Sequence, residues 1–584
     1  MTGHSTLGGN MRTFLIFSSV FAIFAGGCGS RASENGDFST ASLSSASDAK
    51  SADGGYSKGG TSTYYTKDAG STGSDSTSAD ASGGIAMGPA DETGIGLKPG
   101  GAQDINYFRA LLKNGTLPKP TDMTLEGWLN EHDTVLPPPQ PDRAITLHAM
   151  GAVVQNAWPD GDLQSTTGEA VLQIGLNSGL KLADVKDSAS LTVVVDHSGS
   201  MAGEKMADVH LGLHALIDAA PATTELAILG FSFSVETDLP PTLLTPEGRA
   251  DAHAAVEKLL ATGGTNIHDG LQEGIQLCQK APEKFKFRHV LFLSDGQATE
   301  GDQDPEHIKK LASDAHANGC TVSTVGVGLD FDAPLMTAMG EQGGGTAWFM
   351  PDASHAKEIF IQDIETLMLP VADALTLKFA MAPGWKVKQI YGFDWVQKDD
   401  VVTITGPSKG EVPNPGDPTT QDPPPDNQPP VAMPTLFASK RNALIMARLQ
   451  PPAETDFSKI VDLTLASVTY SYHLAKANKT ETFTVPVQVP GLQQVADGGL
   501  AYFASPIVRR AWILLHVGLD LRYACALAAS GTKSDAQQLL ANRIAWFDKH
   551  FAQFSSEELQ TVDASQPDMP DAKALMQSLA TVIK

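Results

Sequence analysis

Three oxygen-bearing side chains follow an apolar stretch of the chain at intervals of two residues. Asp196, Ser198 and Ser200 come directly after the run LTVVV, with Gly199 between the two serines. An apolar and β-branched run of this kind predicts a strand buried on both faces, which is typical of a parallel sheet covered by helices. Ligands of such sheets bind beyond the carboxyl ends of the strands. We therefore expect these three side chains to lie at a ligand-binding edge.

The chemistry of this edge favours a hard divalent cation, because Asp196, Ser198 and Ser200 offer only oxygen atoms. Mg²⁺ and Ca²⁺ take carboxylate and hydroxyl ligands, and Mg²⁺ prefers octahedral geometry. The spacing therefore predicts the first part of a cation site.

The pattern D-x-S-x-S after an apolar strand resembles the metal ion-dependent adhesion site of von Willebrand factor type A domains. In that family a threonine from a second loop and an aspartate from a third loop complete the site. Both occur downstream in this order: Thr265 in TGGTN, before an amphipathic helical pattern, and Asp295 in LSDGQ, after the apolar run HVLFL. The resemblance implies a metal site made of Asp196, Ser198, Ser200, Thr265 and Asp295, holding Mg²⁺ or else Mn²⁺ or Ca²⁺.

The resemblance also implies how such a site binds its ligand. The hydroxyls of Ser198, Ser200 and Thr265 would bind the ion directly, and Asp196 and Asp295 would act largely through water. An ion held mainly by neutral oxygens keeps much of its charge and attracts a carboxylate from outside. The expected ligand is therefore a protein partner that offers an acidic side chain. For any one of these residues taken alone, the alternative is an ordinary helix cap.

His197 lies inside the motif, beside Asp196 and Ser198, and raises the question of a catalytic triad. Adjacent residues of one loop point in different directions, whereas a triad needs the base within about 3 Å of its partners. We therefore expect an exposed histidine that is not a ligand. The sequence also lacks the patterns G-x-x-x-x-G-K-[ST] and H-E-x-x-H, which mark phosphate-binding loops of nucleotide-binding enzymes and the zinc sites of metalloproteases. We expect no catalytic residues and no enzyme activity.

The charge of the chain excludes some classes of partner. The formal net charge is −26 at pH 7, whereas nucleic acid and anionic lipid headgroups attract basic surfaces. We therefore expect no binding to nucleic acid.

Three acidic residues, Glu300, Asp302 and Asp304, follow LSDG closely. They predict a solvated loop or, as the alternative, an acidic rim of the metal site.

The fold class follows from alternating patterns between about residues 187 and 369. With 584 residues, the chain has room for two to four domains of ordinary size. Alternating β and helical stretches predict an α/β fold with a doubly wound, mostly parallel sheet, and the resemblance to the A domain covers this whole span. The expected strands are 191–196, 225–233, 289–293, 321–328 and 345–350, and the expected helices are 204–219, 246–260, 267–280, 305–318, 333–339 and 353–367.

The flanking regions predict further elements. Residues 103–142 carry two short amphipathic helical patterns and resemble the segment that precedes the A domain in a family of bacterial lipoproteins. Residues 143–186 predict a small antiparallel β region that frames the A domain. Residues 370–490 predict an additional antiparallel, sandwich-like β domain, which the proline-rich loop 407–434 interrupts. Residues 491–584 predict C-terminal helices with a buried apolar stripe.

The N-terminal 28 residues predict export. Arg12 precedes FLIFSSVFAIF, and AGGC ends at Cys28. The apolar run is far shorter than the about 20 residues that span a bilayer, so residues 1–28 predict a signal peptide. A cysteine after small residues resembles the bacterial lipobox, in which cleavage leaves that cysteine as the lipidated N-terminus. The alternative is ordinary secretion with an unmodified Cys28. Because Gly29 is not the aspartate that retains such lipoproteins in the inner membrane, the resemblance implies the outer membrane.

Residues 29–102 predict a disordered tether, because Ser, Gly, Ala, Asp and Thr dominate them and such a composition cannot bury enough apolar surface to offset the ordering entropy. The remaining cysteines are Cys278, Cys320 and Cys525. Their wide spacing has no zinc or redox pattern, and three thiols cannot all pair in an oxidising compartment. We therefore expect all three cysteines to be buried free thiols.

These patterns together predict a lipid-anchored protein of the bacterial cell envelope whose A domain binds a protein partner through Mg²⁺. Two alternatives stay open. One is an enzyme with an unrecognised active site in residues 371–584, and the other is an assembly factor for an envelope complex.

The anchor prediction is testable by cell fractionation. Cys28→Ser should release the protein from membranes into the soluble fraction, because this residue supplies the predicted lipid attachment. Continued co-sedimentation of the variant with membranes would show that another part of the chain anchors it.

Overall fold

The computed structural model describes residues 95–99, 101–132, 136–140, 143–154, 169–180, 188–357, 359–360, 370–398, 401–407, 436–439, 442–453, 455, 463–474, 477–489, 501–503, 505–554 and 568–584. The predicted signal peptide, Cys28, residues 29–94 of the predicted tether and residues 408–434 of the predicted proline-rich loop lie outside the described residues.

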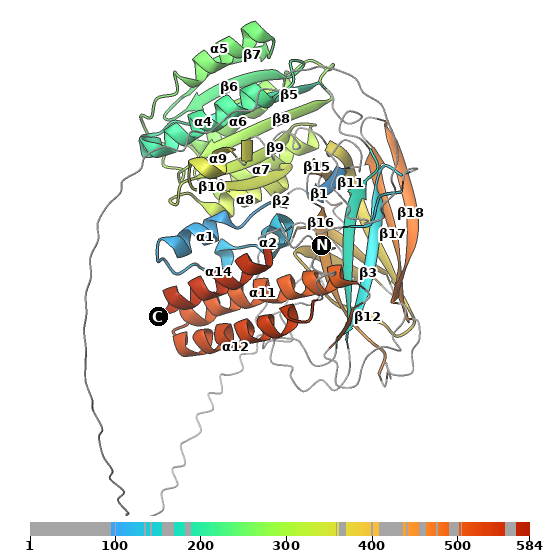
Figure 1. The fold of residues 1–584 in the computed structure, drawn as a ribbon. Helices are drawn as coiled ribbons and strands as arrows, with labels where there is room; N and C mark the ends of the chain where they lie inside the picture. Colours follow the sequence, from blue (N-terminus) through green and yellow to red (C-terminus); the bar gives the residue numbers. More distant parts are fainter. Residues whose placement is uncertain are drawn as a thin grey trace, which may run out of the picture. The chain divides into compact units, whose positions relative to one another are not determined.

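A mostly parallel sheet forms the centre of the predicted A domain (Figure 1). Its strands are parallel except for the last, which pairs antiparallel with its neighbour. In spatial order they are β2 (Gly101–Ala102), β10 (Gly344–Met350), β9 (Thr321–Val327), β8 (Phe287–Ser294), β5 (Ala189–Asp196), β6 (Glu225–Phe231) and β7 (Val235–Leu243). The predicted α/β class with a doubly wound sheet is confirmed.

Helices cover both faces of this sheet, so β5 is buried along all eight of its residues. Successive strand residues point to opposite faces. Val193 and Val195 therefore join the core under one set of helices, and Val194 joins the core under the other. The first set is α4 (Glu204–Ala219), α5 (Pro246–Val256) and α9 (Ala353–Lys357), and the second is α6 (Ile267–Gln279), α7 (Pro305–Ala317) and α8 (Ala333–Gln342).

The edge strand β7, which contains Pro240 and Pro241, was not predicted from the sequence. A proline has no backbone N–H to donate to a ladder and is tolerated at a sheet edge. In the structure β7 pairs with β6 along one side, which is the position that accommodates both prolines.

A second sheet is antiparallel throughout its described pairs and contains twelve of the described strands. Its main path runs through β12 (Lys386–Tyr391), β16 (Ala443–Gln450), β4 (Glu169–Ser178), β1 (Ile95–Pro99), β15 (Leu436–Ser439), β11 (Pro370–Met381), β14 (Val401–Pro407) and β13 (Phe393–Lys398). Also paired to it are β17 (Leu463–Leu474), β18 (Lys479–Val489), β3 (Thr146–Val154) and β19 (Ala501–Phe503). This is the predicted additional β domain.

Two boundaries of this β domain differ from the prediction. The predicted tether 29–102 ends too late, because β1 pairs with β4 and β15 with Leu97 fully buried, and β2 pairs with β10. Residues 143–186 do not form a separate region that frames the A domain. Their strands β3 and β4 pair with each other, and β4 pairs along its length with β16, so they belong to the same sheet as residues 370–490.

The predicted N-terminal helices α1 (Asn106–Lys113) and α2 (Leu125–Glu131), with the short 3₁₀ helix Pro120–Asp122 between them, pack against the C-terminal helices. These are α11 (Pro506–Ala529), α12 (Lys533–Phe551) and α14 (Asp568–Ile583). Arg109 of α1 links α2 to α14, since it donates to Glu131 at 2.6 Å and to Asp571 at 2.7 Å.

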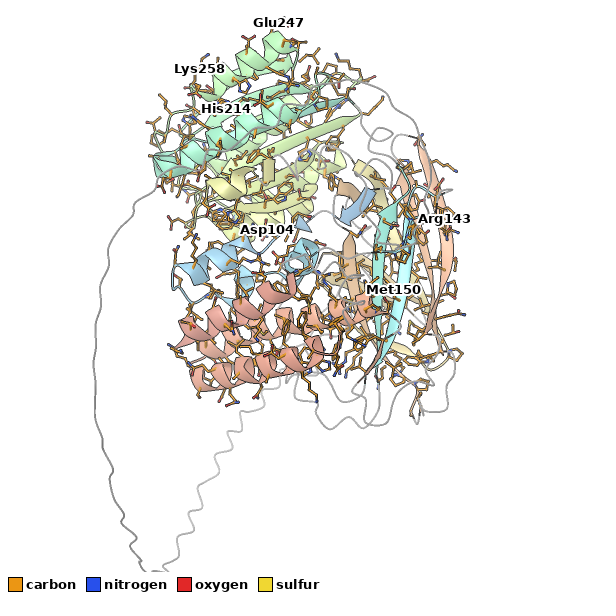
Figure 2. All side chains as sticks on the ribbon, viewed as in Figure 1. Asp104, Arg143, Met150, His214, Glu247 and Lys258 are labelled. Carbon is orange, nitrogen blue, oxygen red and sulfur yellow. A yellow bond between two sulfur atoms is a disulfide. The ribbon has the colours of Figure 1, made fainter. Side chains whose placement is uncertain are left out.

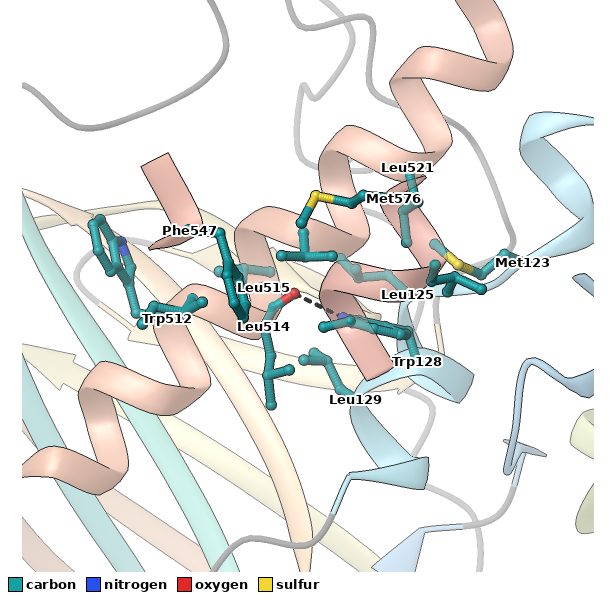
Figure 3. Close-up of a cluster of buried hydrophobic side chains, with 14 of the residues drawn as sticks. Met123, Leu125, Trp128, Leu129, Trp512, Leu514, Leu515, Leu521, Phe547 and Met576 are labelled. Atoms are coloured by element: carbon teal, nitrogen blue, oxygen red, sulfur yellow. Dashed lines mark hydrogen bonds between the residues drawn. The ribbon is translucent and has the colours of Figure 1, made fainter. Parts of the chain in front are cut away.

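Trp128 of α2 is the central residue of this packing (Figure 3). Its side chain is fully buried, and its indole N–H donates to the carbonyl of Leu514 in α11 at 2.7 Å. The two helices approach closely at Gly518, where a Cβ atom would lie 2.5 Å from Trp128 Cδ1. A glycine is therefore needed at this point of α11.

Helix α11 is long and apolar enough to cross a membrane by length and composition, and 78% of its most apolar window is buried inside the protein. It also carries the buried Asp520, which pairs with Arg543 of α12. A helix that already buries its surface against protein behaves as a core helix, in agreement with the predicted buried stripe.

The expectation of three free thiols is wrong for two of them. Cys278 at the end of α6 and Cys320 directly before β9 form a disulfide, and both lie in the same buried cluster. Their separation of 42 residues along the chain gave no sign that the two ends meet on one face of the sheet. Cys525 in α11 is a buried free thiol, and burial raises its pKa to about 12.

The packing of Trp128 predicts a large loss of stability on truncation. Trp128→Ala should lower the free energy of unfolding by about 3–5 kcal/mol, because it removes a fully buried ring and leaves a cavity. Trp128→Phe should cost less, since it retains most of the apolar contact. Phe233→Ala, at a side chain that is 63% exposed, is the control and should change the stability little. Denaturant unfolding that shows equal stability of Trp128→Ala and the wild type would contradict this packing.

Candidate metal centre

Asp196 ends β5, and its buried carboxylate joins two loops. Its Oδ1 accepts the backbone N–H of Ser198 at 2.8 Å, and its Oδ2 accepts the hydroxyl of Ser294, the last residue of β8, at 2.6 Å. Burial raises the pKa of Asp196, and these hydrogen bonds offset part of that rise. The carboxylate is thus held at the carboxyl end of two neighbouring parallel strands.

Ser198, Ser200 and Asp295 form a chain of oxygen atoms beside it. The two serine hydroxyls lie 2.9 Å apart, and Ser200 donates to Asp295 Oδ1 at 2.8 Å. Ser198 and Asp295 are buried, whereas Ser200 is exposed. The oxygen cluster therefore begins inside the protein and opens to solvent at Ser200.

Thr265 completes the cluster from a second loop. A Cβ atom on Gly296 would lie 3.4 Å from Thr265 Oγ1 and 3.7 Å from Asp196 Oδ2. Gly296 therefore lies beside both side chains, and a larger residue there would push into the cluster. The backbone of Thr265 is fixed to the third loop, since its N–H donates to Thr299 Oγ1 at 3.0 Å and its carbonyl accepts from Thr299 N at 2.9 Å.

The first and second loops are also tied together. Gly199 donates its N–H to the carbonyl of Gly263 at 3.0 Å, and Thr262 donates to the carbonyl of His197 at 2.6 Å. Each pair of the three loops therefore shares hydrogen bonds. The five residues of the predicted site, Asp196, Ser198, Ser200, Thr265 and Asp295, lie together at this edge of the sheet, and their binding of a metal stays a prediction.

The donor set fits a hard divalent cation. Two neighbouring ligands of an octahedral Mg²⁺, each at about 2.0–2.1 Å, lie about 2.9 Å apart, and the oxygens of Ser198 and Ser200 have that separation. The set contains hydroxyls and two carboxylates. Among the described residues, no group of three or more His, Cys, Asp or Glu side chains is arranged to hold a metal. Ser198, Ser200 and Thr265 would hold the ion through neutral hydroxyls, and the ion would keep part of its positive charge for an outside ligand.

Lys205 is a member of this site that the sequence did not reveal. From the first turn of α4, its ammonium donates to Asp295 Oδ2 at 2.5 Å and lies 3.8 Å from Asp330. Its aliphatic stem passes Gly328, where a Cβ atom would lie 2.6 Å from Lys205 Cε. No local pattern distinguishes this lysine from an ordinary helix-surface lysine, because its partner lies 90 residues further along the chain.

His197 does not point into the oxygen cluster. Its ring contacts the carbonyl of Leu260 through Nδ1 at 3.1 Å and lies near Asp238 and Gly230 on the other side. This arrangement holds the ring away from Ser198, as expected for a histidine that is not a ligand. The side chain is partly buried rather than exposed.

The acidic residues after LSDG divide into two groups. Asp302 accepts from the backbone of Asp304 at 3.0 Å and from His307 Nδ1 at 2.7 Å, and Asp304 caps α7 by accepting from the N–H of Glu306. These contacts lower the pKa of Asp302 and raise that of His307. Only Glu300 lies against the second loop, with its Cγ 3.0 Å from a Cβ position on Gly264. Asp302 and Asp304 thus belong to a solvated loop.

Part of the chain is similar to known proteins. Residues 190–362 match the family model of the von Willebrand factor type A domain. The chain is 24% identical over 200 residues to the protein YfbK of Escherichia coli, covering 34% of each chain. It is 29% identical over 201 residues to the protein sll0103 of Synechocystis, covering 34% of this chain and 47% of that one. It therefore spans less than half the length of these curated relatives.

A mammalian relative and two solved structures are also similar. The human inter-alpha-trypsin inhibitor heavy chain H3 is 29% identical over 164 residues, covering 27% of this chain and 18% of that one. A von Willebrand factor type A structure from Catenulispora acidiphila has a TM-score of 0.46 at 13% identity, covering 70% of this chain and 87% of that one. Proximal thread matrix protein 1 of the mussel byssus, described with a zinc-occupied adhesion-site motif, has a TM-score of 0.26 at 22% identity, covering 30% and 44%.

The position of Lys205 predicts that this residue weakens cation binding. Lys205→Met keeps the aliphatic stem and removes the ammonium that occupies Asp295. The affinity for Mg²⁺ should rise at least about tenfold, because one unit charge a few ångströms away is worth more than the about 1.4 kcal/mol of a tenfold change even at an effective dielectric constant of 20. Isothermal titration calorimetry with Mg²⁺ measures the affinity of the wild type and of the variant.

Lys310→Met is the matched control for this change. Lys310 pairs with Asp314 on the surface of α7 at 2.8 Å, so its loss should leave the affinity for Mg²⁺ unchanged. An affinity of Lys205→Met equal to or below that of the wild type would refute the proposed competition for Asp295.

Proposed function

We propose that this von Willebrand factor type A domain binds a divalent cation, with Mg²⁺ as the first candidate, and uses it to hold an acidic side chain of a protein partner. Domains of this family commonly bind other proteins. The observation that carries the proposal is the cluster of three hydroxyls, those of Ser198, Ser200 and Thr265, at the carboxyl edge of the sheet, where Ser200 is exposed. We propose a binding protein and not an enzyme.

The carboxylates and the hydroxyls of the site would have different roles. The carboxylates of Asp196 and Asp295 position the serine loop through hydrogen bonds, and their own charge attracts a cation. The hydroxyls are neutral, so they do not cancel the charge of an ion that they bind. The exposed position of Ser200 leaves a path from outside, which a partner's carboxylate needs in order to reach the site.

Two exposed apolar side chains flank the site and favour a protein ligand. Phe233 is 63% exposed and Leu260 is 69% exposed. The ring of Phe233 lies against the second loop, 2.8 Å from a Cβ position on Gly264, and Leu260 is tied to the first loop through His197. Aromatic and aliphatic side chains beside a charged centre are typical of a protein interface.

We propose that the protein is anchored to the cell envelope, on the outer membrane, by a lipid on Cys28. The disulfide between Cys278 and Cys320 supports export, because disulfides persist in oxidising compartments. An enzyme active site in residues 371–584 and a role as an assembly factor for an envelope complex are the alternatives.

Removing two of the three hydroxyls tests the metal site. Ser198→Ala with Ser200→Ala should abolish the stabilisation of the domain by Mg²⁺, which for the wild type is about 2.7 kcal/mol at about 100 times the dissociation constant. The fold should persist, because small hydroxyls at a loop contribute little to core packing. Thermal melting in Mg²⁺ and in EDTA measures the effect. Ser188→Ala is the control, at the opposite end of β5, where the hydroxyl lies 3.5 Å from the carbonyl of Lys284.

The partner is tested by affinity capture of envelope proteins with the wild type, with this double variant and with chelator present. A protein captured only by the wild type, and only without chelator, is the expected result. If the wild type melts identically in Mg²⁺ and EDTA, and captures its partner equally in both, metal-dependent binding is wrong. The domain would then serve only as a scaffold.

A further inference from the structure

A pair of histidines joins helices α4 and α5 on the outside of the A domain. His214 lies in the middle of α4, and His253 lies in the last turns of α5. Figure 2 labels His214, and labels Glu247 and Lys258 near the two ends of α5. Both rings are partly exposed, at 29% for His214 and 33% for His253. No residue of the oxygen cluster described above takes part.

The two rings face each other through the same type of nitrogen. His214 Nδ1 and His253 Nδ1 lie 2.7 Å apart. The other nitrogen of each ring contacts a carboxylate from the opposite helix. His214 Nε2 lies 2.9 Å from Glu257 Oε1, and His253 Nε2 lies 3.1 Å from Asp218 Oδ1.

The hydrogen-bond partners determine which nitrogen of each ring carries a proton. An ionised carboxylate only accepts hydrogen bonds, so each Nε2 must donate, and a neutral imidazole carries one N–H. In both neutral rings Nδ1 is then an unprotonated nitrogen with a lone pair. Two lone pairs that face each other at 2.7 Å repel, unless a cation lies between or beside them.

We propose that His214 and His253 bind one first-row transition-metal ion through their Nδ1 atoms, with water completing its coordination. Histidines that ligate metals characteristically donate their second ring N–H to a carboxylate, which fixes the tautomer and raises the basicity of the ligating nitrogen. Glu257 and Asp218 are the carboxylates that contact the second nitrogen here, one for each ring. Their two negative charges also balance a divalent ion.

The chemistry of the pair selects a different ion from that of the oxygen cluster. Imidazole nitrogen suits Zn²⁺, Cu²⁺ and Ni²⁺, whereas Mg²⁺ and Ca²⁺ take oxygen ligands. Two nitrogens on a tetrahedral Zn²⁺, each at about 2.0–2.1 Å, lie about 3.3 Å apart. The two Nδ1 atoms, which lie 2.7 Å apart, must therefore separate by about 0.6 Å to bind such an ion. Small side-chain rotations at this partly exposed position are enough for that movement.

The ion would crosslink two helices that adjoin the oxygen cluster. Helix α4 follows the loop of Ser198 and Ser200 closely, and the chain after α5 leads to the loop of Thr265. Binding at the histidine pair therefore fixes these two segments relative to each other without contacting the oxygen cluster.

The test is a Zn²⁺ titration of the metal-stripped full chain by calorimetry. The wild type should bind one more equivalent of Zn²⁺ than His214→Ala with His253→Ala. The double variant Ser198→Ala with Ser200→Ala should retain that equivalent, which separates this site from any binding of Zn²⁺ at the oxygen cluster. His307→Ala, at an exposed histidine paired with Asp302, is the control and should bind as the wild type does.

A spectroscopic measurement identifies the ligands. Cu²⁺ bound to the variant Ser198→Ala with Ser200→Ala should show electron paramagnetic resonance couplings to two imidazole nitrogens, and the single changes His214→Gln and His253→Gln should each remove one. Circular dichroism checks that the variants fold. Equal zinc stoichiometry in the wild type and in the histidine double variant would overturn the proposal, and would leave a shared proton as the cation between the rings.

Discussion

The candidate site depends on one buried carboxylate. Asp196 is fully buried where β5 ends, and it accepts hydrogen bonds from Ser294 of the neighbouring strand and from the backbone of Ser198. An ionised carboxylate inside a protein is costly unless its oxygens are bonded. The two loops must therefore keep these positions for the fold to accommodate Asp196, and the serine hydroxyls are brought near Asp295 as a consequence. Hydrogen bonds within the protein thus hold the side chains of the site in place.

The rest of the chain supports this edge from a distance. The strand β2 extends the parallel sheet beyond β10, and the helices that follow it pack through Trp128 and Arg109 against the C-terminal helices. One short N-terminal segment thus contacts both the A domain and the C-terminal core. The burial of this N-terminal segment explains why the C-terminal helices fold together with the A domain.

Residue patterns predicted the fold of the A domain well, because strands buried on both faces and amphipathic helices leave strong local signals. Helix α4 begins and ends where the pattern placed it, and the five site residues lie together. Features that depend on contacts between distant segments could not be predicted. These include the ion pair of Lys205 with Asp295, the disulfide of Cys278 with Cys320, and the pairing of β1 with β15. In each case the local sequence is ordinary, and only the folded chain brings the partners together.

The central claim is that the hydroxyls of Ser198, Ser200 and Thr265 hold a divalent cation. Anomalous X-ray diffraction from crystals of the protein grown with Mn²⁺ tests it most directly, because manganese scatters anomalously and replaces Mg²⁺ at oxygen sites. The account predicts an anomalous peak within about 2.5 Å of the hydroxyl oxygens of Ser198 and Ser200. An oxygen cluster without such a peak, in crystals grown at saturating Mn²⁺, would contradict it.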